Sequence, residues 1–452
     1  MTKSLRKLWD LLLFRDRGIL PTKRFIISYF LLSLVLISLS FFDVSWTFIL
    51  LTNGLLIGFS FLDLLFSPRQ KELTFSREIE EKLERNIVYD VIIHVRNDSD
   101  KSFSFTLMDD LPDSFKGSFQ MVETVSPKAT EKFSYEIKPL VRGDYVFEKL
   151  SIRYTSFLRL WQKQMAVQDE AQVKVIPDLS EAKSYLTDAQ RFLTYEGVHI
   201  KKQQVGMGEF ASIRSYVVGD DPRMINWHQT AKLQEVMTNQ YEPEQGKYVT
   251  ILIDAGRMMG VELKTGNRLE RSLEAAITVA AAALERGDYV SVIAFSKGVR
   301  IFIPPEKGMY QLQRIINEIY NLQVEPVESN YVEAFHYVET MVNKRSLLLL
   351  FSDIQTVLQN DYLIGQLSRL RRRHLFFVVG IDDGVLLKRA NMRPESVSES
   401  MMKSVAQEQV LSKNRAKLFW EQRGLHFVEA EEERVTAVAL SHYIDLMNRG
   451  LL

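Results

Sequence analysis

The sequence VTILIDAGRMMG, residues 249–260, decides the fold of the second half of the chain. An apolar run ends on Asp254 and then breaks at once into a turn. This is how a buried strand of an open α/β sheet ends, and such sheets gather their functional groups at the carboxyl ends of the strands. The stretch therefore predicts a buried parallel sheet and makes Asp254 the first candidate site residue.

Predicted strands and helices alternate from residue 249 to residue 452, which is typical of a doubly wound α/β domain. Continuous apolar runs such as SLLLLF at 346–351 indicate strands that helices cover on both faces. A long helix is predicted over 405–423, and we interpret the Ser- and Met-containing stretch around 396–402 as a linker.

The composition excludes several classes of function. The 452 residues contain 57 basic and 57 acidic side chains, so the net charge gives no indication of nucleic-acid binding. The absence of cysteine excludes thiol catalysis, disulfides and cysteine metal sites. The sequence also lacks a G-x-x-x-x-G-K-[ST] phosphate loop and a nucleophile motif. We therefore expect no enzyme and no cofactor, with Mg²⁺ as the one candidate ion.

Two apolar segments, 25–42 and 46–66, are each long enough to cross a bilayer. Only three residues separate them, which predicts a hairpin of two transmembrane helices. Basic residues lie before the first segment and after the second, but not between them. Positive residues stay on the inner side, so we expect a multi-pass protein of the cell membrane with its amino terminus and soluble domains in the cytoplasm. The segment 1–24 is predicted to be amphipathic and to lie on the inner leaflet.

The middle of the chain has a different periodicity. From about residue 72 to residue 177, apolar residues alternate in short runs that turn signals separate. This pattern predicts an antiparallel β-sandwich of immunoglobulin type, followed by a connecting segment. The predicted domains are therefore 1–24, 25–66, 72–177, 178–248 and 249–452.

Acids and hydroxyls follow several strands of the predicted α/β domain, and others precede a predicted helix. Oxygen ligands from separate loops suit a hard cation such as Mg²⁺. Side chains of this kind also cap helices and turns without binding anything. Spacing alone leaves both interpretations open. The candidates are Asp254, Ser329, Asn330, Ser352, Asp353, Asp382 and Asp383.

This arrangement resembles the von Willebrand factor type A domain, whose metal site uses an Asp-x-Ser-x-Ser motif, a Thr from a second loop and an Asp from a third. Gly256 and Met258 replace both serines of the motif. The resemblance therefore implies the α/β fold and a degenerate metal site. We hypothesise that Arg257 supplies the positive charge that a metal would have given. The residues that match the metal ligands are Asp254, Ser329 and Asp353.

A second informative stretch is GEFASIRSYVVGDDPRMINWHQTAKLQEVM at 208–237. One interpretation makes His228 a general base that Asp220 or Asp221 orients. We favour the other, in which Trp227 fills the core and the charged residues form a local network of ion pairs and caps. The residues of this signature, which we also regard as candidate interaction residues, are Arg214, Tyr216, Gly219, Asp220, Arg223 and Trp227.

The signature is similar to that of the bacterial domain-of-unknown-function fifty-eight family, in particular its YeaD-like membrane proteins. Such proteins often combine a membrane hairpin, a β-sandwich and a von Willebrand A-like domain. The resemblance implies partnership with MoxR-type AAA+ ATPases and an assembly role at the membrane.

Three functions remain open at this point. The first is a membrane-anchored interaction or assembly factor without enzymatic activity, which we favour. The second is a metal-dependent hydrolase at the Asp254/Asp353 crevice, with His228 as a further catalytic group. The third is a structural protein of the envelope, which the distribution of basic residues argues against.

Overall fold

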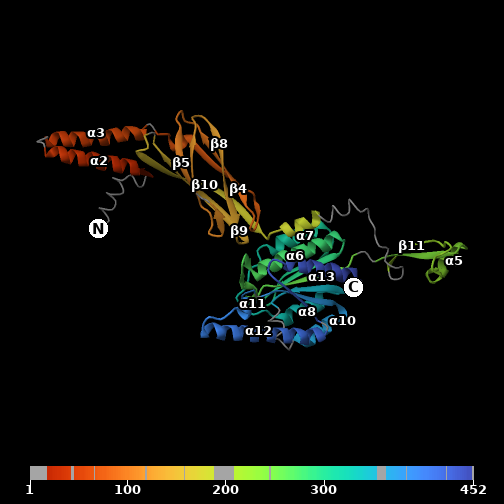
Figure 1. Cartoon of the computed structure of the whole chain (residues 1–452). Helices are drawn as coiled ribbons and strands as arrows, with labels where there is room; N and C mark the ends of the chain where they lie inside the picture. Colours follow the sequence, from red (N-terminus) through yellow and green to blue (C-terminus); the bar gives the residue numbers. More distant parts are fainter. Residues whose placement is uncertain are drawn as a thin grey trace. The chain divides into compact units, whose positions relative to one another are not determined.

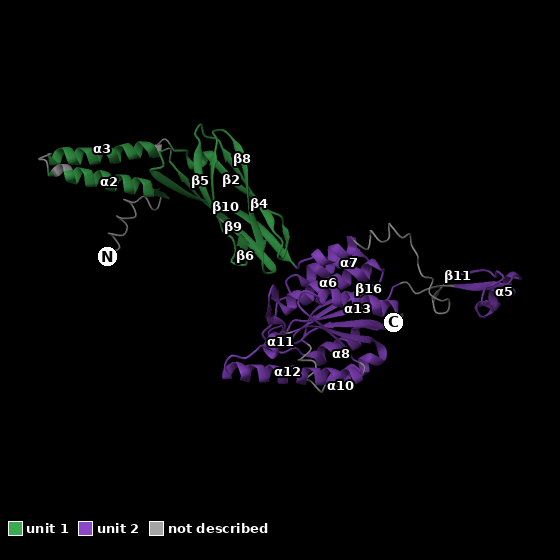
Figure 2. Ribbon diagram, in the orientation of Figure 1, with its two compact units in different colours: residues 1–176 green, residues 177–452 purple. Residues whose placement is uncertain are grey.

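The computed structural model describes residues 18–41, 45–65, 67–117, 120–156, 158–187, 208–243, 246–353, 363–382, 384–423 and 425–449. The chain forms two compact units, residues 1–176 and 177–452 (Figure 2). This boundary lies beside the predicted end of the β-rich segment at Pro177. Most of the predicted amphipathic segment, up to residue 17, lies outside the described residues.

Unit 1 contains two helices that lie side by side, α2 (Lys23–Ser40) and α3 (Trp46–Leu65) (Figure 1). Within the described residues, α3 is the one helix that is long and apolar enough to cross a bilayer, over Trp46–Leu64. Only 11% of that apolar window is buried. The helix therefore exposes its apolar side chains instead of forming the core of a soluble domain. The structure thus shows one candidate membrane helix, and the two-span topology stays a prediction.

The rest of unit 1 consists of two β-sheets, as the period-two pattern predicts. One sheet has the order β1-β10-β9-β5-β7, with β3 beside β10, and the other has the order β2-β4-β8-β6. Alternate side chains of both sheets, such as Ile93 and Phe105, fill one apolar core. The strands are β1 (Ile19–Pro21), β2 (Leu73–Glu78), β3 (Lys82–Glu84), β4 (Tyr89–Asn97), β5 (Phe103–Asp109), β6 (Phe115–Gly117), β7 (Gln120–Val125), β8 (Thr130–Pro139), β9 (Gly143–Thr155) and β10 (Trp161–Ile176).

A small module at residues 208–243 carries the signature sequence, and we call it the signature module. Its strands β11 (Gly208–Ser215) and β12 (Met237–Pro243) form a two-stranded antiparallel sheet. Between them lie the short helices η3 (Pro222–Met224) and α5 (Trp227–Leu233). Asn226 caps α5, because its side chain accepts a hydrogen bond from the backbone N–H of Gln229 at 3.0 Å.

The α/β domain is built on one six-stranded sheet with the order β17-β16-β13-β18-β19-β20. Five strands are parallel, and the edge strand β17 is antiparallel. The chain leaves β13 toward one edge and later returns to build β18 on its other side, so the crevice of this sheet lies at the carboxyl ends of β13 and β18. The strands are β13 (Tyr248–Asp254), β16 (Tyr289–Phe295), β17 (Val299–Glu306), β18 (Ser346–Phe351), β19 (Leu375–Ile381) and β20 (His426–Ala430).

Helices cover both faces of this sheet (Figure 1). One face carries α6 (Arg268–Glu285), α7 (Met309–Ile319) and α13 (Val435–Asn448). The other face carries α8 (Tyr331–Met341), α10 (Leu363–Arg373) and α12 (Val397–Gln422). Between β13 and α6, the chain forms the short helix η4 (Arg257–Gly260) and a tight hairpin of β14 (Glu262–Leu263) and β15 (Gly266–Asn267).

The prediction of a linker around 396–402 is wrong. These residues form the first turns of α12, and the Ser396 hydroxyl caps the helix by accepting the backbone N–H of Glu399 at 3.2 Å. A Ser-x-x-Glu sequence at this position is a helix-start signal, which the polar composition concealed. The structure also adds the short helix α11 (Gly384–Asn391), which the sequence analysis did not predict.

Candidate functional site

Asp254 lies at the centre of the crevice, at the end of β13, and is only 1% exposed. Its Oδ1 accepts the backbone N–H of Gly256 at 2.8 Å and the hydroxyl of Ser329. Its Oδ2 accepts the Tyr331 hydroxyl at 2.8 Å and the Ser352 hydroxyl at 2.6 Å. Each carboxylate oxygen therefore has two protein donors, which is the usual capacity of its lone pairs.

Tyr331 contributes to this arrangement as a neutral donor. Burial, and next the nearby Asp254 carboxylate, raise the pKa of the Tyr331 hydroxyl well above its ordinary value. The hydroxyl therefore keeps its proton at all physiological pH values and stabilises the Asp254 carboxylate by a hydrogen bond.

Gly256 stands where the metal-binding motif would have its first serine. A Cβ atom at this position would lie 1.9 Å from the Ser329 hydroxyl oxygen, so a side chain fits here only if that hydroxyl moves away. The Ser329 hydroxyl thus occupies the space that a serine at 256 would need. The Ser329 hydroxyl can therefore donate to Asp254 from this position because residue 256 has no side chain.

Asp353, which follows β18, forms a buried ion pair with Arg268, the first residue of α6. The Nη1–Oδ1 distance is 2.7 Å, and both side chains are only 7% exposed. Arg268 therefore supplies the positive charge beside the crevice acids, a role that our hypothesis gives to Arg257. That hypothesis is wrong, because η4 directs Arg257 outward, where it pairs with the exposed Glu328 at 3.0 Å.

The site does not fit a divalent cation. Its predicted ligands share the crevice, and Ser329 contacts Asp254 directly. However, donors already satisfy the Asp254 oxygens, and a guanidinium group neutralises Asp353. Among the residues that the structure describes, no three His, Asp or Glu side chains form a cluster that would hold a metal. The chemistry this arrangement supports is structural, because hydrogen bonds and one ion pair lock the ends of β13 and β18.

A cavity of about 920 Å³ lies beside this lock, at the carboxyl ends of β19 and β20. Its lining includes the apolar Leu263 and Val385, the acids Asp382 and Glu431, and Arg268 itself. Asp382, one of the candidate acids, lies 3.7 Å from the ammonium group of Lys413, and Asp383 lies outside the described residues.

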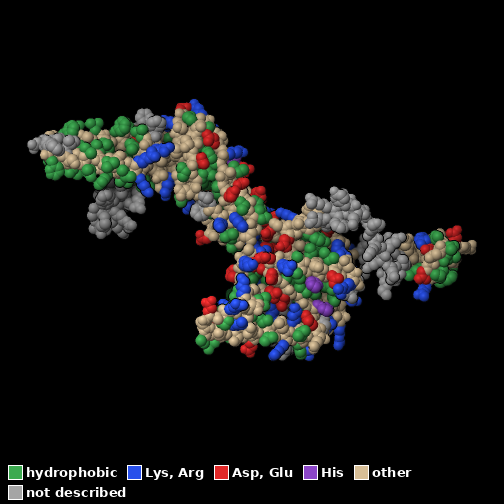
Figure 3. All heavy atoms as spheres, in the orientation of Figure 1, with side chains coloured by type: hydrophobic (Ala, Val, Ile, Leu, Met, Phe, Trp, Pro, Cys, Tyr) green, Lys and Arg blue, Asp and Glu red, His purple; other side chains and the backbone are tan. Residues whose placement is uncertain are grey.

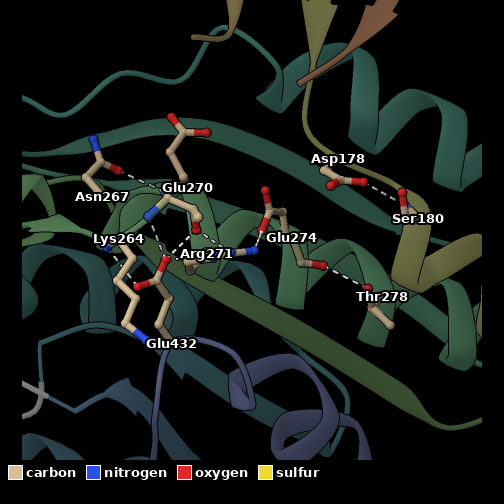
Figure 4. Close-up of polar contacts among 10 residues, drawn as sticks. Asp178, Ser180, Lys264, Asn267, Glu270, Arg271, Glu274, Thr278 and Glu432 are labelled. Carbon is tan, nitrogen blue, oxygen red and sulfur yellow. Dashed lines mark hydrogen bonds and ion pairs between the residues drawn. The ribbon is translucent and has the colours of Figure 1, made fainter. Parts of the chain in front are cut away.

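Glu432 fixes the rim of this cavity (Figure 4). Its carboxylate accepts the backbone N–H groups of Lys264 and Thr265, both at 2.9 Å, and pairs with Arg271 at 3.4 Å. Arg271 also pairs with Glu274 at 2.7 Å. Burial alone would raise the pKa of Glu432, but the hydrogen bonds from Thr265 and its neighbour hold it below the ordinary value. The charged rim is therefore tied to the β14–β15 hairpin.

The signature module contains the Arg214–Asp220 part of the predicted charge network, while Arg223 forms no ion pair with another residue that the structure describes. Arg214 pairs with Asp220 at 2.7 Å, and the Asp220 carboxylate also accepts the backbone N–H of Val217 at 3.0 Å. The hydrogen bond from Arg214 holds the pKa of the Asp220 carboxyl below its ordinary value. The Tyr216 hydroxyl donates to the Asp220 carbonyl at 3.2 Å. These contacts close a tight turn, in which Gly219 has a φ of +114° that favours glycine.

Comparison with known families now identifies this region. Residues 212–385 match the family model described as "Protein of unknown function DUF58". The chain therefore contains a DUF58 region. The matched residues run from β11 to α11 and so include most of the signature module and five of the six strands of the α/β sheet.

The other comparisons add no function to the DUF58 protein. No curated protein matches the chain. One solved structure that it resembles is "Crystal structure of Salmonella alpha-2-macroglobulin reacted with methylamine", at 12% identity and a TM-score of 0.18. That match covers 23% of the DUF58 protein and 7% of the other chain. A similarity this weak supports no conclusion about fold or activity.

One prediction for the DUF58 signature is wrong. Trp227 does not fill a core but is 71% exposed at the start of α5. A seven-residue helix and a two-stranded sheet are too small to form a core that would bury an indole ring. His228 is also exposed, while Asp221 accepts the backbone N–H of Arg223 at 2.9 Å. The acids proposed to orient His228 are therefore engaged elsewhere.

Two residues of the crevice, Tyr331 and Arg268, are not among the residues that the sequence predicts for it. Tyr331 gave no signal, because a tyrosine in the first turn of a helix is unremarkable. Arg268 did give one. A cation at a helix amino terminus opposes the helix dipole, so its presence there indicates an acidic partner nearby.

Proposed function

We propose that this DUF58 protein is a membrane-anchored interaction or assembly factor that works with a MoxR-type AAA+ ATPase. In this proposal α2 and α3 anchor the chain, the two β-sheets form an immunoglobulin-like sandwich, and the α/β domain is a von Willebrand A-like domain in the cytoplasm. The protein has no catalytic activity of its own. The DUF58 region supports the choice of ATPase through the resemblance stated above.

The observation that carries the proposal is the exposure of Trp227. The same module exposes Val218, at 96%, as well as Val217 and Leu233. Figure 3 shows apolar side chains on the surface of this module. Tryptophan dominates the energy of many protein interfaces, and exposed apolar clusters mark such interfaces. A module that leaves these side chains in solvent is better suited to holding a partner than to stabilising its own fold.

The crevice supports a non-catalytic role. A hydrolase would need Asp254 to bind a metal or to activate water, but four donors already satisfy its carboxylate. No observation favours the hydrolase alternative. The order of the six strands, with one antiparallel edge strand, supports the von Willebrand A-like assignment of the α/β domain.

The test is retention of a purified MoxR-type ATPase by the intact chain. Trp227→Ala is expected to weaken binding by roughly 30-fold, the loss of about 2 kcal/mol that is typical of an interface hot spot. Tyr310→Ala is the matched control, because Tyr310 is 80% exposed but lies on α7, outside the module. Equal binding by both variants, or no retention by the wild type, contradicts the proposal.

The membrane topology requires a separate measurement. A tag at the carboxyl terminus is expected to resist protease added from the outer side of the membrane and to be cleaved when the protease reaches the inner side. The opposite result would support the envelope alternative.

A further inference from the structure

The ends of α2 and α3 that face the β-sheets are fixed to one strand, β10, and to the turn before it. Strand β1 leads directly into α2 and pairs with β10, with Ile19 opposite Lys163. At the end of α3, the buried Asp63 carboxylate accepts the Ser156 hydroxyl and the backbone N–H of Leu158, the latter at 2.8 Å. Both helices are therefore held against the same turn, of which residues 156 and 158–161 are described.

Trp161 fills the space between the two helices. Its ring centroid lies 5.4 Å from that of Phe25 on α2 and 5.6 Å from that of Phe61 on α3. Its indole N–H donates to the backbone carbonyl of Ser60 at 3.0 Å. This packing places the first turn of α2 and the last turns of α3 beside the polar loops of the β-sheet.

Basic side chains surround this junction, and we call them the basic collar. The Thr22 hydroxyl donates to the Arg159 carbonyl at 2.7 Å, which brings Arg159 beside the start of α2. The Lys163 ammonium group donates to the Pro68 carbonyl at 3.3 Å, which brings the segment after α3 to the same place. Figure 3 shows Lys and Arg side chains gathered where the apolar helices meet the sheets. The basic collar consists of Lys23, Arg24, Arg69, Lys71 and Arg159.

The charges of the basic collar are not neutralised by ion pairs within the described part of unit 1. All five side chains are exposed, and none forms an ion pair with another residue that the structure describes. Glu72 follows Lys71 in the sequence. Its carboxylate accepts a hydrogen bond from the backbone N–H of Arg69 at 3.0 Å and is not paired with the Arg69 or Lys71 side chain. Exposed apolar side chains, such as Ile26 and Leu62, begin immediately beside the cations.

We propose that the basic collar binds the phosphate groups of anionic phospholipids in the leaflet that α2 and α3 enter. The inference rests on the membrane anchoring in the proposed function. Cations at the depth of the headgroups are attracted to anionic lipids, while the apolar belt beside them fixes that depth. Arg159 lies about 100 residues from the membrane segments in sequence, so only the fold assigns it to this surface.

The test is lipid selectivity of the intact chain in bilayers. Spin-labelled phosphatidylglycerol and phosphatidylcholine report which lipid is immobilised at the protein surface. We expect a preference for phosphatidylglycerol that weakens as salt is raised. Neutralising a collar cation is expected to reduce the preference by up to about fivefold, the equivalent of about 1 kcal/mol. The variants are Lys71→Gln and Arg159→Gln, alone and together.

Lys116→Gln with Lys132→Gln is the matched control, because it removes two exposed cations from β6 and β8, outside the collar. A preference that falls in the collar variants and not in the control supports the proposal. Insertion without any preference, or an equal loss in both pairs, overturns the basic collar alone. Extraction of the wild type by alkaline carbonate overturns membrane anchoring, and the proposed function with it.

Discussion

The buried pair of Arg268 and Asp353 yields the most quantitative prediction. At 2.7 Å and an effective dielectric constant of about 20, the Coulomb attraction is about 6 kcal/mol. The cost of desolvating both groups offsets much of this attraction. Arg268→Met removes the attraction and leaves the Asp353 carboxylate buried without its partner. We expect the free energy of unfolding to fall by about 3–5 kcal/mol.

The assay is thermal unfolding of the intact chain, followed by near-ultraviolet circular dichroism. For a domain of this size, the expected loss corresponds to a fall of about 6–20 °C in Tm. The double variant Arg268→Met with Asp353→Leu is expected to recover most of the loss, because no buried charge remains. Arg257→Met is the matched control. It breaks the exposed pair with Glu328 and is expected to cost less than about 1 kcal/mol.

Mg²⁺ provides the second half of the same experiment. If the crevice bound Mg²⁺, a concentration 100 times the Kd would stabilise the wild type by about 2.7 kcal/mol and raise Tm by about 5–10 °C. We expect no change. The reasoning is refuted if Mg²⁺ stabilises the wild type, or if Arg268→Met unfolds at the wild-type temperature without added metal.

Three further predictions concern single positions. Gly256→Ala is expected to destabilise the α/β domain by about 1–3 kcal/mol in urea unfolding, because its Cβ would overlap the Ser329 hydroxyl. Adding Ser329→Gly is expected to relieve the overlap but to restore only part of that stability, because Asp254 then loses a donor. Burial, and next Arg373, lower the pKa of His374 from 6.5 to about 4, so the folded state binds fewer protons than the unfolded state between these values. At about 1.4 kcal/mol per pH unit, up to about 3 kcal/mol of stability is therefore present above pH 6.5 and lost as the pH falls to about 4, and His374→Gln should flatten this dependence. Trp227→Ala is expected to change stability by less than about 0.5 kcal/mol, since its side chain is exposed, and a larger loss in urea unfolding would indicate a buried role.

Periodicity was sufficient to predict the α/β domain. The buried strands β13, β18 and β19 are continuous apolar runs, and a run of this kind has few alternatives in a chain where helices separate the runs. The two β-sheets of unit 1 were predictable from the alternation of apolar and polar residues, because successive side chains of a strand point to opposite faces of its sheet.

Contacts between distant residues were not predictable from the sequence. The position of Asp254 was evident from its strand, but its donors Ser329 and Tyr331 lie 75 and 77 residues away. Whether Arg257 or Arg268 lies beside the crevice acids depends on the direction in which η4 points the Arg257 side chain. No pattern in the sequence predicts that direction. Trp227 was predicted to be buried because tryptophan usually is, and the small size of its module decided otherwise.

The packing of Gly256 against Ser329 also limits the order in which this crevice can change. A serine introduced at 256 alone collides with Ser329, and removal of Ser329 alone leaves Asp254 one donor short. Each single change at this contact is therefore costly, although the two changes together need not be. A side chain at position 256 is thus accommodated only if the Ser329 hydroxyl moves, so the glycine couples this position to the set of donors around Asp254.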